Sequence, residues 1–473
     1  MACVGSSSQL AARVMGTSGV CASCQKLLQI KAPHMWAAMR GMRRWKKKVL
    51  EREDLKEEVV EYVGKSPRRA DRVYAWGCAV TGALGIASYL RPEKTQRPLV
   101  QQARPARVKF IDINHMKPYL VTCGYGFTLY AVRSAQGLQL LGTGINTSSQ
   151  LGYHEVPRNS GRILDYIIEP VEIPLPLNQP RSTRIRDLGC GRAHTVVITE
   201  GEGVYSLGNN AYGQCGRPIV EGEEFSKNPL VNTIQGLPDD VVQVSCGQDH
   251  TIFVSSAGEL YSCGLGADGQ TGLGHYNLVG SPTRIGGDVD GEKIVSVHGR
   301  GDCVLAVSDK GDVFGWGNSE YNQLAMVTEH TQINTPHYLP LSRCGRIIKA
   351  VAGGSACAVL NDKGQVFVWG YGILGKGPAL ESSDTPTQIP PTLFGRNELE
   401  PHTKVIDIKC GLGHFVALTD NGDVYSWGHS RQGCLGLGTN ENQFFPLKVS
   451  IPAEAHALAC GVDHTVALCK SFT

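Results

Sequence analysis

The chain has 473 residues, a formal net charge of +3, 57 glycines and 16 cysteines. Hydrophobic residues make up 41% of the chain, which is enough to bury a large core. No run of about 18 predominantly apolar residues occurs, so we expect no membrane-spanning helix and only peripheral contact with a membrane.

Basic residues dominate the beginning of the chain. Residues 1–50 contain nine Lys or Arg and no Asp or Glu. This composition is typical of an organellar transit peptide, which forms a cationic amphipathic helix and is drawn inward by the membrane potential. It predicts a mitochondrial transit segment over 1–50, a linker over 51–69, and a location in the matrix or on the matrix-facing inner membrane. The alternative is a disordered basic tail or a nuclear address at 43–48.

An internal repeat follows. Its clearest copy has a Cys-Gly-x-Asp-His start at 246–250, an apolar segment up to 254, an aromatic-containing segment at 258–264 and a Gly-Gln-x-Gly turn at 269–272. From His250 to the start of the second segment at Leu260 is ten residues, and the same spacing recurs in two other copies. The remaining copies are these: full copies begin at Cys190 and Cys410, and degenerate copies begin at Cys123, Gly299 and Gly353.

Each copy has the pattern of a β-hairpin. Short apolar and aromatic-rich segments alternate with glycine-bearing turns, and the Asn-Gly pair at 421–422 is a strong hairpin signal. Helical periodicity is absent from the repeats, so we predict an all-β fold.

The two ends of the repeat region are complementary halves. Residues 73–85 contain only the second half of a repeat, and residues 460–468 contain only the first half. Counted together they complete a seventh unit. An open solenoid requires polar caps at both ends, whereas a ring pairs the two ends and protects its edge strands. We therefore predict a seven-bladed β-propeller over 70–473, closed by pairing of the N-terminal and C-terminal half-repeats.

The cysteines do not form a metal-binding pattern. Cys21 and Cys24 make an isolated CxxC inside the predicted transit segment. Five others share one repeat position, each followed by glycine, which is typical of small buried hydrophobic residues; these are Cys123, Cys190, Cys246, Cys410 and Cys460. We expect no bound metal and no cofactor.

The repeats resemble those of the regulator of chromosome condensation family, whose units carry CGxxHTxxLTxxGxVYxWGxNxxGQLG. The resemblance extends over about residues 70–473, and the runs at 263–276 and 369–378 are similar to a mitochondrial member of the family. It implies a guanine-nucleotide exchange factor for the dynamin-related mitochondrial fusion GTPase. It also implies a role with assembly and rRNA-modifying factors of the large mitochondrial ribosomal subunit and its rRNA. The alternative is a scaffold for rRNA maturation factors without exchange activity.

Several motifs that suggest catalysis are explained by the repeat. Four histidines share one repeat position (His194, His250, His414 and His464), and residues spread around a ring cannot converge on one site. We expect them to pack or to bond a turn. The GxxxxGK run at 370–376 has Gly377 where a Mg²⁺-binding Ser or Thr is required. We expect no bond-making catalysis.

Two acidic residues are candidates for contact with a GTPase. Asp249 and Asp463 precede the repeat His, and in exchange factors of the family an acid at this position contributes to the surface that meets the GTPase. The alternative is that each carboxylate caps its own turn. Of the two, Asp249 is the stronger candidate.

A basic loop over 91–109 is a candidate for phosphate contact. Without the nine N-terminal charges, residues 51–473 carry about −6, so a general nucleic-acid coat is not expected. Against that acidic background the loop contains one acid, Glu93, and six bases: Arg91, Lys94, Arg97, Arg104, Arg107 and Lys109. We expect it to contact rRNA phosphates, or else to be an ordinary solvated loop.

Overall fold

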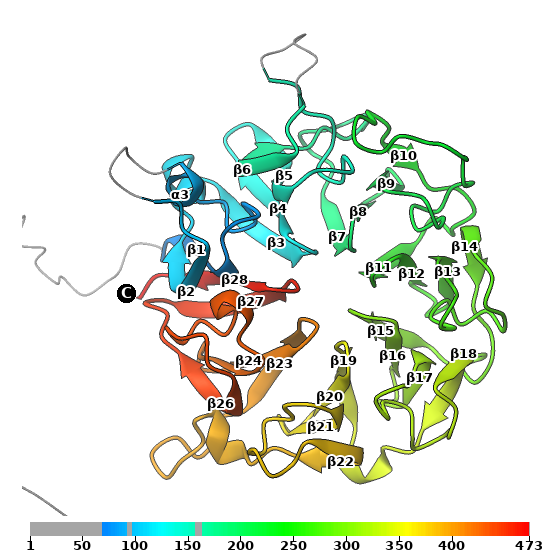
Figure 1. The fold of residues 1–473 in the computed structure, drawn as a ribbon, viewed down its shortest axis with the longest axis vertical. Coiled ribbons are helices and arrows are strands. Elements are labelled where there is room, and N and C mark those ends of the chain that lie inside the picture. Colours follow the sequence, from blue (N-terminus) through cyan, green and yellow to red (C-terminus); the bar gives the residue numbers. More distant parts are fainter. Residues whose placement is uncertain (1–68, 92–96, 157–162, 473) are drawn as a thin grey trace, which may run out of the picture. The chain divides into compact units, whose positions relative to one another are not determined.

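Seven four-stranded antiparallel sheets surround a central axis in the described part of the chain, as Figure 1 shows. The computed structural model describes residues 69–91, 97–156 and 163–472. The predicted transit segment and all of the predicted linker except Arg69 lie outside these residues, as does Lys94. The predicted seven-bladed all-β propeller is confirmed.

The blades are numbered from the first complete one, and the strands of each are given from the axis outward. Blade 1 contains β3 (Lys117–Cys123), β4 (Phe127–Ser134), β5 (Gly137–Ile145) and β6 (Tyr166–Glu172). Blade 2 contains β7 (Ile185–Cys190), β8 (His194–Thr199), β9 (Val204–Gly208) and β10 (Asn232–Thr233). Blade 3 contains β11 (Val241–Cys246), β12 (His250–Ser255), β13 (Leu260–Gly264) and β14 (Val279–Arg284). Blade 4 contains β15 (Ile294–His298), β16 (Cys303–Ser308), β17 (Val313–Asn318) and β18 (Gln332–Leu339). Blade 5 contains β19 (Ile347–Ala352), β20 (Ala356–Asn361), β21 (Val366–Tyr371) and β22 (Ser382–Gln388). Blade 6 contains β23 (Val405–Cys410), β24 (His414–Thr419), β25 (Val424–Gly428) and β26 (Gln443–Val449). Blade 7 contains β27 (Glu454–Cys460), β28 (His464–Lys470), β1 (Asp71–Cys78) and β2 (Gln101–Arg107).

Short helical turns connect some of these strands. They are α2 (Ala87–Leu90), α3 (Lys109–Ile113), η2 (Ser342–Cys344), η3 (Pro391–Phe394) and η4 (Arg431–Gly433). Within the described residues, no helix is long and apolar enough to cross a bilayer.

Blade 7 combines strands from both ends of the propeller. β1 pairs antiparallel with β28 over seven residue pairs, from Asp71 opposite Lys470 to Gly77 opposite His464. This sheet therefore joins the first described strand to the last one.

Burial explains why the second strand of each repeat is so apolar. All six residues of β8, β12, β16, β20 and β24 are buried, because neighbouring blades cover both faces of each sheet. Strands buried on both faces read as continuous hydrophobic runs, whereas the outermost strands are mainly polar and have no buried residue in β2, β14 or β22.

Among the described residues, tryptophans bind three of the blades to the blade before them, through Trp76, Trp316 and Trp369. The indole N–H of Trp316 donates to the Gln270 carbonyl at 3.0 Å, and that of Trp369 donates to the Gln323 carbonyl at 2.7 Å. Both side chains are fully buried. The repeat thus satisfies the single polar group of a large buried ring within the adjacent blade.

Three of the repeat histidines bind their blade to the next one. Nε2 of His194 lies 3.0 Å from Oγ1 of Thr251, and Nε2 of His464 lies 2.8 Å from Oγ1 of Thr128. His414 makes the same kind of contact, and all four repeat histidines are buried. Burial lowers the pKa of His194 and His464 to about 3 and that of His250 and His414 to about 4. The structural interpretation of these histidines is confirmed.

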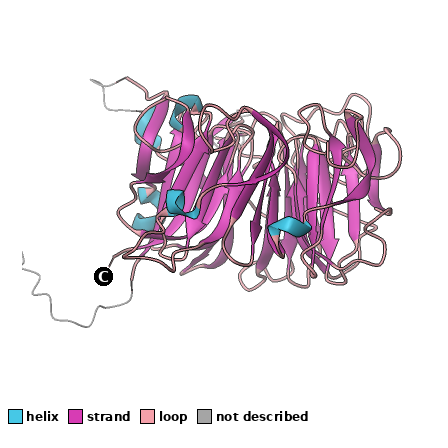
Figure 2. Ribbon diagram, turned by 90° about the horizontal axis from the view of Figure 1, so that it is seen from below, coloured by secondary structure: helices cyan, strands magenta, loops and turns pink. Residues whose placement is uncertain are grey.

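The loops divide between two faces, seen edge-on in Figure 2. Because the strands of a blade alternate in direction, the loops from first to second strand and from third to fourth strand share one face. We call it the Cys-Gly face, after the Cys-Gly pair that begins the first kind of loop. The hairpins between second and third strands and the connections between blades lie on the opposite face.

Candidate functional site on the Cys-Gly face

Arg300 occupies the axis of the propeller beneath this face. Its guanidinium extends from blade 4 and donates hydrogen bonds to the carbonyls that end the inner strands of blades 1, 2 and 7. The three acceptors are Cys123 at 2.9 Å, Cys190 at 3.2 Å and Cys460 at 2.7 Å. The residue is only 9% exposed. A buried cation therefore closes the channel and joins blades on opposite sides of the ring.

Elsewhere in the channel, side chains of one inner strand protect the edge of the next. The Val244 N–H of blade 3 donates to the Asp187 carboxylate of blade 2 at 2.9 Å. Gln243 in turn accepts from the Val297 N–H at 3.2 Å and donates to the Val297 carbonyl at 3.3 Å. Exposed strand edges otherwise leave unpaired backbone groups. These contacts and Arg300 together satisfy backbone groups around the channel.

Asp249 lies at the mouth of this channel and is paired with Arg192. The Arg192 guanidinium of blade 2 contacts both carboxylate oxygens, at 3.2 Å and 2.5 Å. Asp249 is 5% exposed, whereas the Arg192 side chain is 49% exposed. Burial raises the pKa of the Asp249 carboxyl, and Arg192 opposes that rise. The carboxylate is thus covered by a cation that solvent can reach.

Asp302 adds a second carboxylate beside Asp249. It accepts hydrogen bonds from the side-chain amides of Gln248 at 2.9 Å and Gln270 at 3.2 Å. Burial raises its pKa, and its negative charge contributes to the raised pKa of Asp249. This part of the face therefore holds two poorly solvated acids and one adjacent cation, Arg192.

Asp463 lies on another part of the same face, in blade 7. It borders a pocket of about 330 Å³ whose other charged and aromatic residues are Tyr321, Tyr371, His414, His429 and Arg431. Its Oδ1 atom is buried and accepts no hydrogen bond from any described residue, and burial raises the pKa of Asp463 while Arg431 lowers it. The structure thus places both predicted acids on one face but in different blades, each with its own neighbours.

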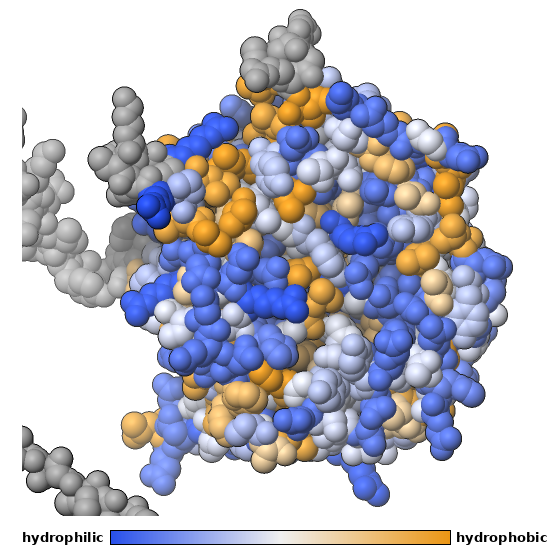
Figure 3. Space-filling model, viewed as in Figure 1, coloured by the Kyte–Doolittle hydropathy of each residue, from blue (hydrophilic) through white to orange (hydrophobic). Residues whose placement is uncertain are grey.

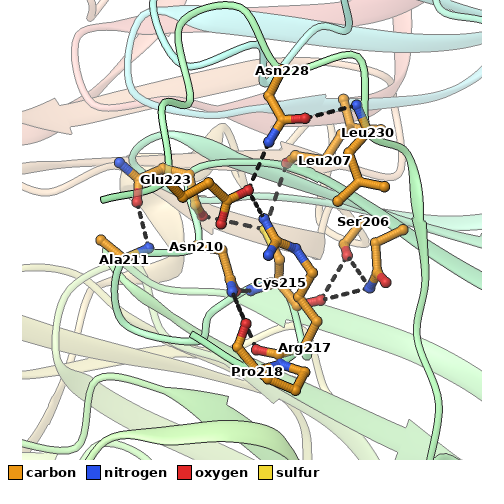
Figure 4. A network of polar contacts seen from close by, with 12 residues as sticks. Ser206, Leu207, Asn210, Ala211, Cys215, Arg217, Pro218, Glu223, Asn228 and Leu230 are labelled. Carbon is orange, nitrogen blue, oxygen red and sulfur yellow. Dashed lines mark hydrogen bonds and ion pairs between the residues drawn. The ribbon is translucent and has the colours of Figure 1, made fainter. Parts of the chain in front are cut away.

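A long, well-anchored loop stands beside Asp249 on this face. Residues 209–231 connect β9 to β10, and Figure 4 shows the polar contacts that hold them. Arg217 forms an ion pair with Glu223, whose carboxylate also accepts from Asn228 at 2.7 Å. Asn210 donates to the carbonyls of Arg217 and Pro218 at 3.2 Å. The loop therefore presents a fixed surface.

The prediction of a basic loop over 91–109 is partly wrong. Residues 101–107 form β2, the outermost strand of blade 7, and Lys109 begins α3. The strand went unrecognised because an outer strand buries too little for apolar alternation, and Pro105 is tolerated at such an edge. Its Arg107 is paired with Asp112. The other described bases of this stretch are exposed and have no carboxylate within 4.0 Å among the described residues: Arg91, Arg97, Arg104 and Lys109.

Hydrophilic residues cover much of the surface in Figure 3, and apolar patches gather near the blades that contain β1 to β6. Exposed apolar residues of these blades include Val80, Leu99, Val100 and Val156. No group of three or more His, Cys, Asp or Glu that could hold a metal is found in the part of the chain that the structure describes. The thirteen described cysteines are all buried and unbridged.

The fold and its repeats define a class of protein. The model of the regulator of chromosome condensation (RCC1) repeat matches residues 202–254, 310–360, 363–418 and 421–468. A second RCC1 repeat model matches 185–214, 241–270 and 405–434.

Named relatives show to which type of RCC1 repeat protein the chain is similar. The human RCC1-like G exchanging factor-like protein is 50% identical over 418 residues, which cover 88% of this chain and 90% of the relative. Its mouse counterpart is 49% identical over the same length. The crystal structure of human WBSCR16 superposes with a TM-score of 0.80 at 50% identity and covers 86% of this chain and all of that one. The chain therefore belongs to the RCC1 repeat family, as a propeller of the RCC1-like G exchanging factor type.

A more distant solved structure shares only the fold. Prp20p from Saccharomyces cerevisiae, described with its binding properties to Gsp1p and histones, superposes with a TM-score of 0.68 at 17% identity. It covers 86% of this chain and 92% of the yeast chain.

Proposed function

We propose that this chain is a mitochondrial guanine-nucleotide exchange factor whose Cys-Gly face contacts a GTPase of the dynamin-related fusion class. The observation that carries the proposal is the group of poorly solvated acids on that face, with Asp249 under a solvent-accessible Arg192 and Asp463 without a partner on Oδ1. Family membership supports nucleotide exchange, and the acid-free basic segment at 1–50 supports the mitochondrial location.

Exchange requires differential binding and no covalent step. A carboxylate that burial has deprived of water gains most from a cation that approaches it. A basic side chain of the GTPase that replaces Arg192, or that enters the pocket at Asp463, is drawn away from the bound nucleotide and its Mg²⁺. The nucleotide-free form of the GTPase is then stabilised, which releases GDP.

Neutralising either acid is expected to slow exchange. In Asp463→Asn and Asp249→Asn the catalysed rate of GDP release should fall about 10-fold, because a contact worth about 1.4 kcal/mol is lost in the exchange complex. Release of a fluorescent GDP analogue from the purified GTPase measures it. Asp309→Asn is the control, since Asp309 is exposed in a hairpin of the opposite face. Equal rates for wild type and both variants would refute a role for these acids.

A second role, with the large mitochondrial ribosomal subunit, rests on a different set of residues. Four exposed bases lie along the outer edge of blade 7 and the adjoining turns: Arg91, Arg97, Arg104 and Lys109. Cations without a carboxylate partner suit the phosphates of rRNA. Arg91 and Arg97 belong to the β1–β2 loop on the Cys-Gly face of blade 7, whereas Arg104 lies in the outermost strand β2 and Lys109 in the turn that follows it. Because the four bases do not include Asp249 or Asp463, an rRNA scaffold can operate with or without exchange.

Charge reversal at this edge tests the second role. Arg97→Glu combined with Arg104→Glu should weaken binding of rRNA fragments about 10-fold at moderate salt and reduce the salt dependence by roughly two phosphate contacts. Filter binding over a range of salt concentrations measures both quantities. Arg284→Glu is the matched control, because Arg284 also lies on an outer strand, β14, but is already paired with acids. An unchanged affinity in the double variant would exclude this edge as an RNA surface.

A further inference from the structure

A polar cavity of about 140 Å³ lies in the central channel beneath Arg300. The inner strands of blades 1 to 4, 6 and 7 line it. Its charged residues are Asp187, Arg300 and Lys409, and Gln243 and Ser245 add further polar groups. The cavity plays no part in the proposed exchange surface.

The cations of this cavity carry N–H donors that are not used in hydrogen bonds to described residues. A guanidinium carries five N–H donors, and Arg300 uses three of them on the carbonyls of blades 1, 2 and 7. Its Nε is buried and has no hydrogen-bond partner in the part of the chain that the structure describes. Lys409 has no carboxylate within 4.0 Å among the described residues, and its ammonium lies beside that of Lys349.

The carboxylates nearby do not balance this charge. Lys349 forms an ion pair with Asp407, and the Asp407 charge also acts on Lys409, so that among the described residues three cations (Arg300, Lys349 and Lys409) face two carboxylates (Asp187 and Asp407). Asp187 already accepts a hydrogen bond from the Val244 N–H. Burial raises the pKa of Asp187 to about 6, so this carboxylate is readily protonated and then no longer offsets the positive charge of Arg300 and Lys409. An excess of positive charge among half-buried side chains is costly unless a counter-ion accompanies it.

We propose that this channel binds one small inorganic anion, a halide or an oxyanion of phosphate size, between Lys409 and the underside of Arg300. A single anion there pairs with the Lys409 ammonium, neutralises the excess charge and occupies a cavity of suitable volume. It also strengthens the contact between blade 6 and the blades that Arg300 joins, so binding of the anion stabilises the closed ring.

Anomalous diffraction from crystals of the protein grown in bromide tests the proposal. The expected result is a bromide peak in contact with Lys409 Nζ, which is lost in Lys409→Met and kept in Lys310→Met, a surface lysine of the opposite face. Thermal unfolding with low concentrations of chloride or phosphate added to a constant gluconate background is the second readout, because phosphate at high concentration stabilises folded proteins without a binding site. A melting temperature raised by phosphate alone identifies an oxyanion, and one raised by chloride identifies a halide.

Two results would overturn the proposal. One is the absence of any bromide peak in the wild-type channel together with equal melting temperatures in gluconate alone and with added chloride or phosphate. The other is a peak that persists in Lys409→Met. The wild-type measurements alone decide the first result, so the proposal stays testable even if Lys409→Met fails to fold.

Discussion

Lowering the pH from 7 to 5 is expected to reduce the free energy of unfolding by more than about 5 kcal/mol, mainly through the four repeat histidines and His298, whose pKa burial also lowers well below its ordinary value. Burial depresses the pKa of the repeat histidines in the folded state to about 3 or 4, from an ordinary 6.5. The unfolded chain therefore binds more protons below pH 6.5. Stability that is complete above that pH is lost progressively as the pH falls toward the folded pKa. Each repeat histidine contributes roughly 2 kcal/mol of this loss at pH 5.

Buried carboxyls oppose the loss. Burial raises the pKa of Asp187 to about 6, and it also raises the pKa of Asp249, Asp302 and Asp463. A carboxyl whose pKa is raised by folding stabilises the folded state as the pH falls through that pKa. At pH 5 the protonation of Asp187 adds roughly 1.4 kcal/mol to the free energy of unfolding. The net loss of stability is therefore smaller than the summed loss from the buried histidines.

Urea unfolding at pH 7, 6 and 5 measures this dependence. His194→Gln should reduce the loss of stability between pH 7 and pH 5 by roughly 2 kcal/mol, because one buried imidazole no longer titrates and glutamine can still bond Thr251. His402→Gln should leave it unchanged, since His402 is exposed. An unfolding free energy that is equal at pH 7 and pH 5 would contradict the account of the buried histidines.

Arg300→Met is expected to destabilise the propeller by about 4 kcal/mol, because three buried carbonyls lose their charged donor together. Arg300→Lys should fall between wild type and Arg300→Met, since an ammonium cannot span three blades with the geometry of a guanidinium. Equilibrium unfolding in urea at pH 7 measures both variants.

A surface arginine provides the control for this variant. Arg284→Met removes two ion pairs whose side chains are about half exposed, and such pairs contribute little in water, so a change below about 0.5 kcal/mol is expected. If Arg300→Met were as stable as Arg284→Met, Arg300 would not be the group that closes the channel.

The blade structure could be predicted from the sequence because each repeat contains strands that are close in sequence and pair with one another. The ten-residue spacing from His250 to Leu260 corresponds to β12 and β13, which pair directly in the structure. The repeated Cys-Gly and Trp-Gly pairs end the first and third strands, where contacts with adjacent blades recur in every unit. Burial of the histidines and cysteines followed from the same regularity.

The outermost strands and the axis could not be predicted in this way. β2 is polar on both sides, and β10 has only two residues, so neither has the alternation that identifies a strand. Arg300 lies in a degenerate copy of the repeat, and its three acceptors are 177, 110 and 160 residues away in the chain. Arg192 was missed for a similar reason, because its partner Asp249 belongs to the next blade.

Photocrosslinking from the two faces of the propeller tests the proposed function most directly. A photoreactive amino acid would replace Tyr371, which is 51% exposed at the pocket of Asp463, or Leu399, which is 94% exposed on the opposite face. Crosslinking in cells, followed by mass spectrometry, identifies the partner at each position. The account predicts a mitochondrial GTPase captured from position 371 and not from position 399. Capture of a GTPase only from position 399, or of ribosome-assembly factors without any GTPase from position 371, would contradict it.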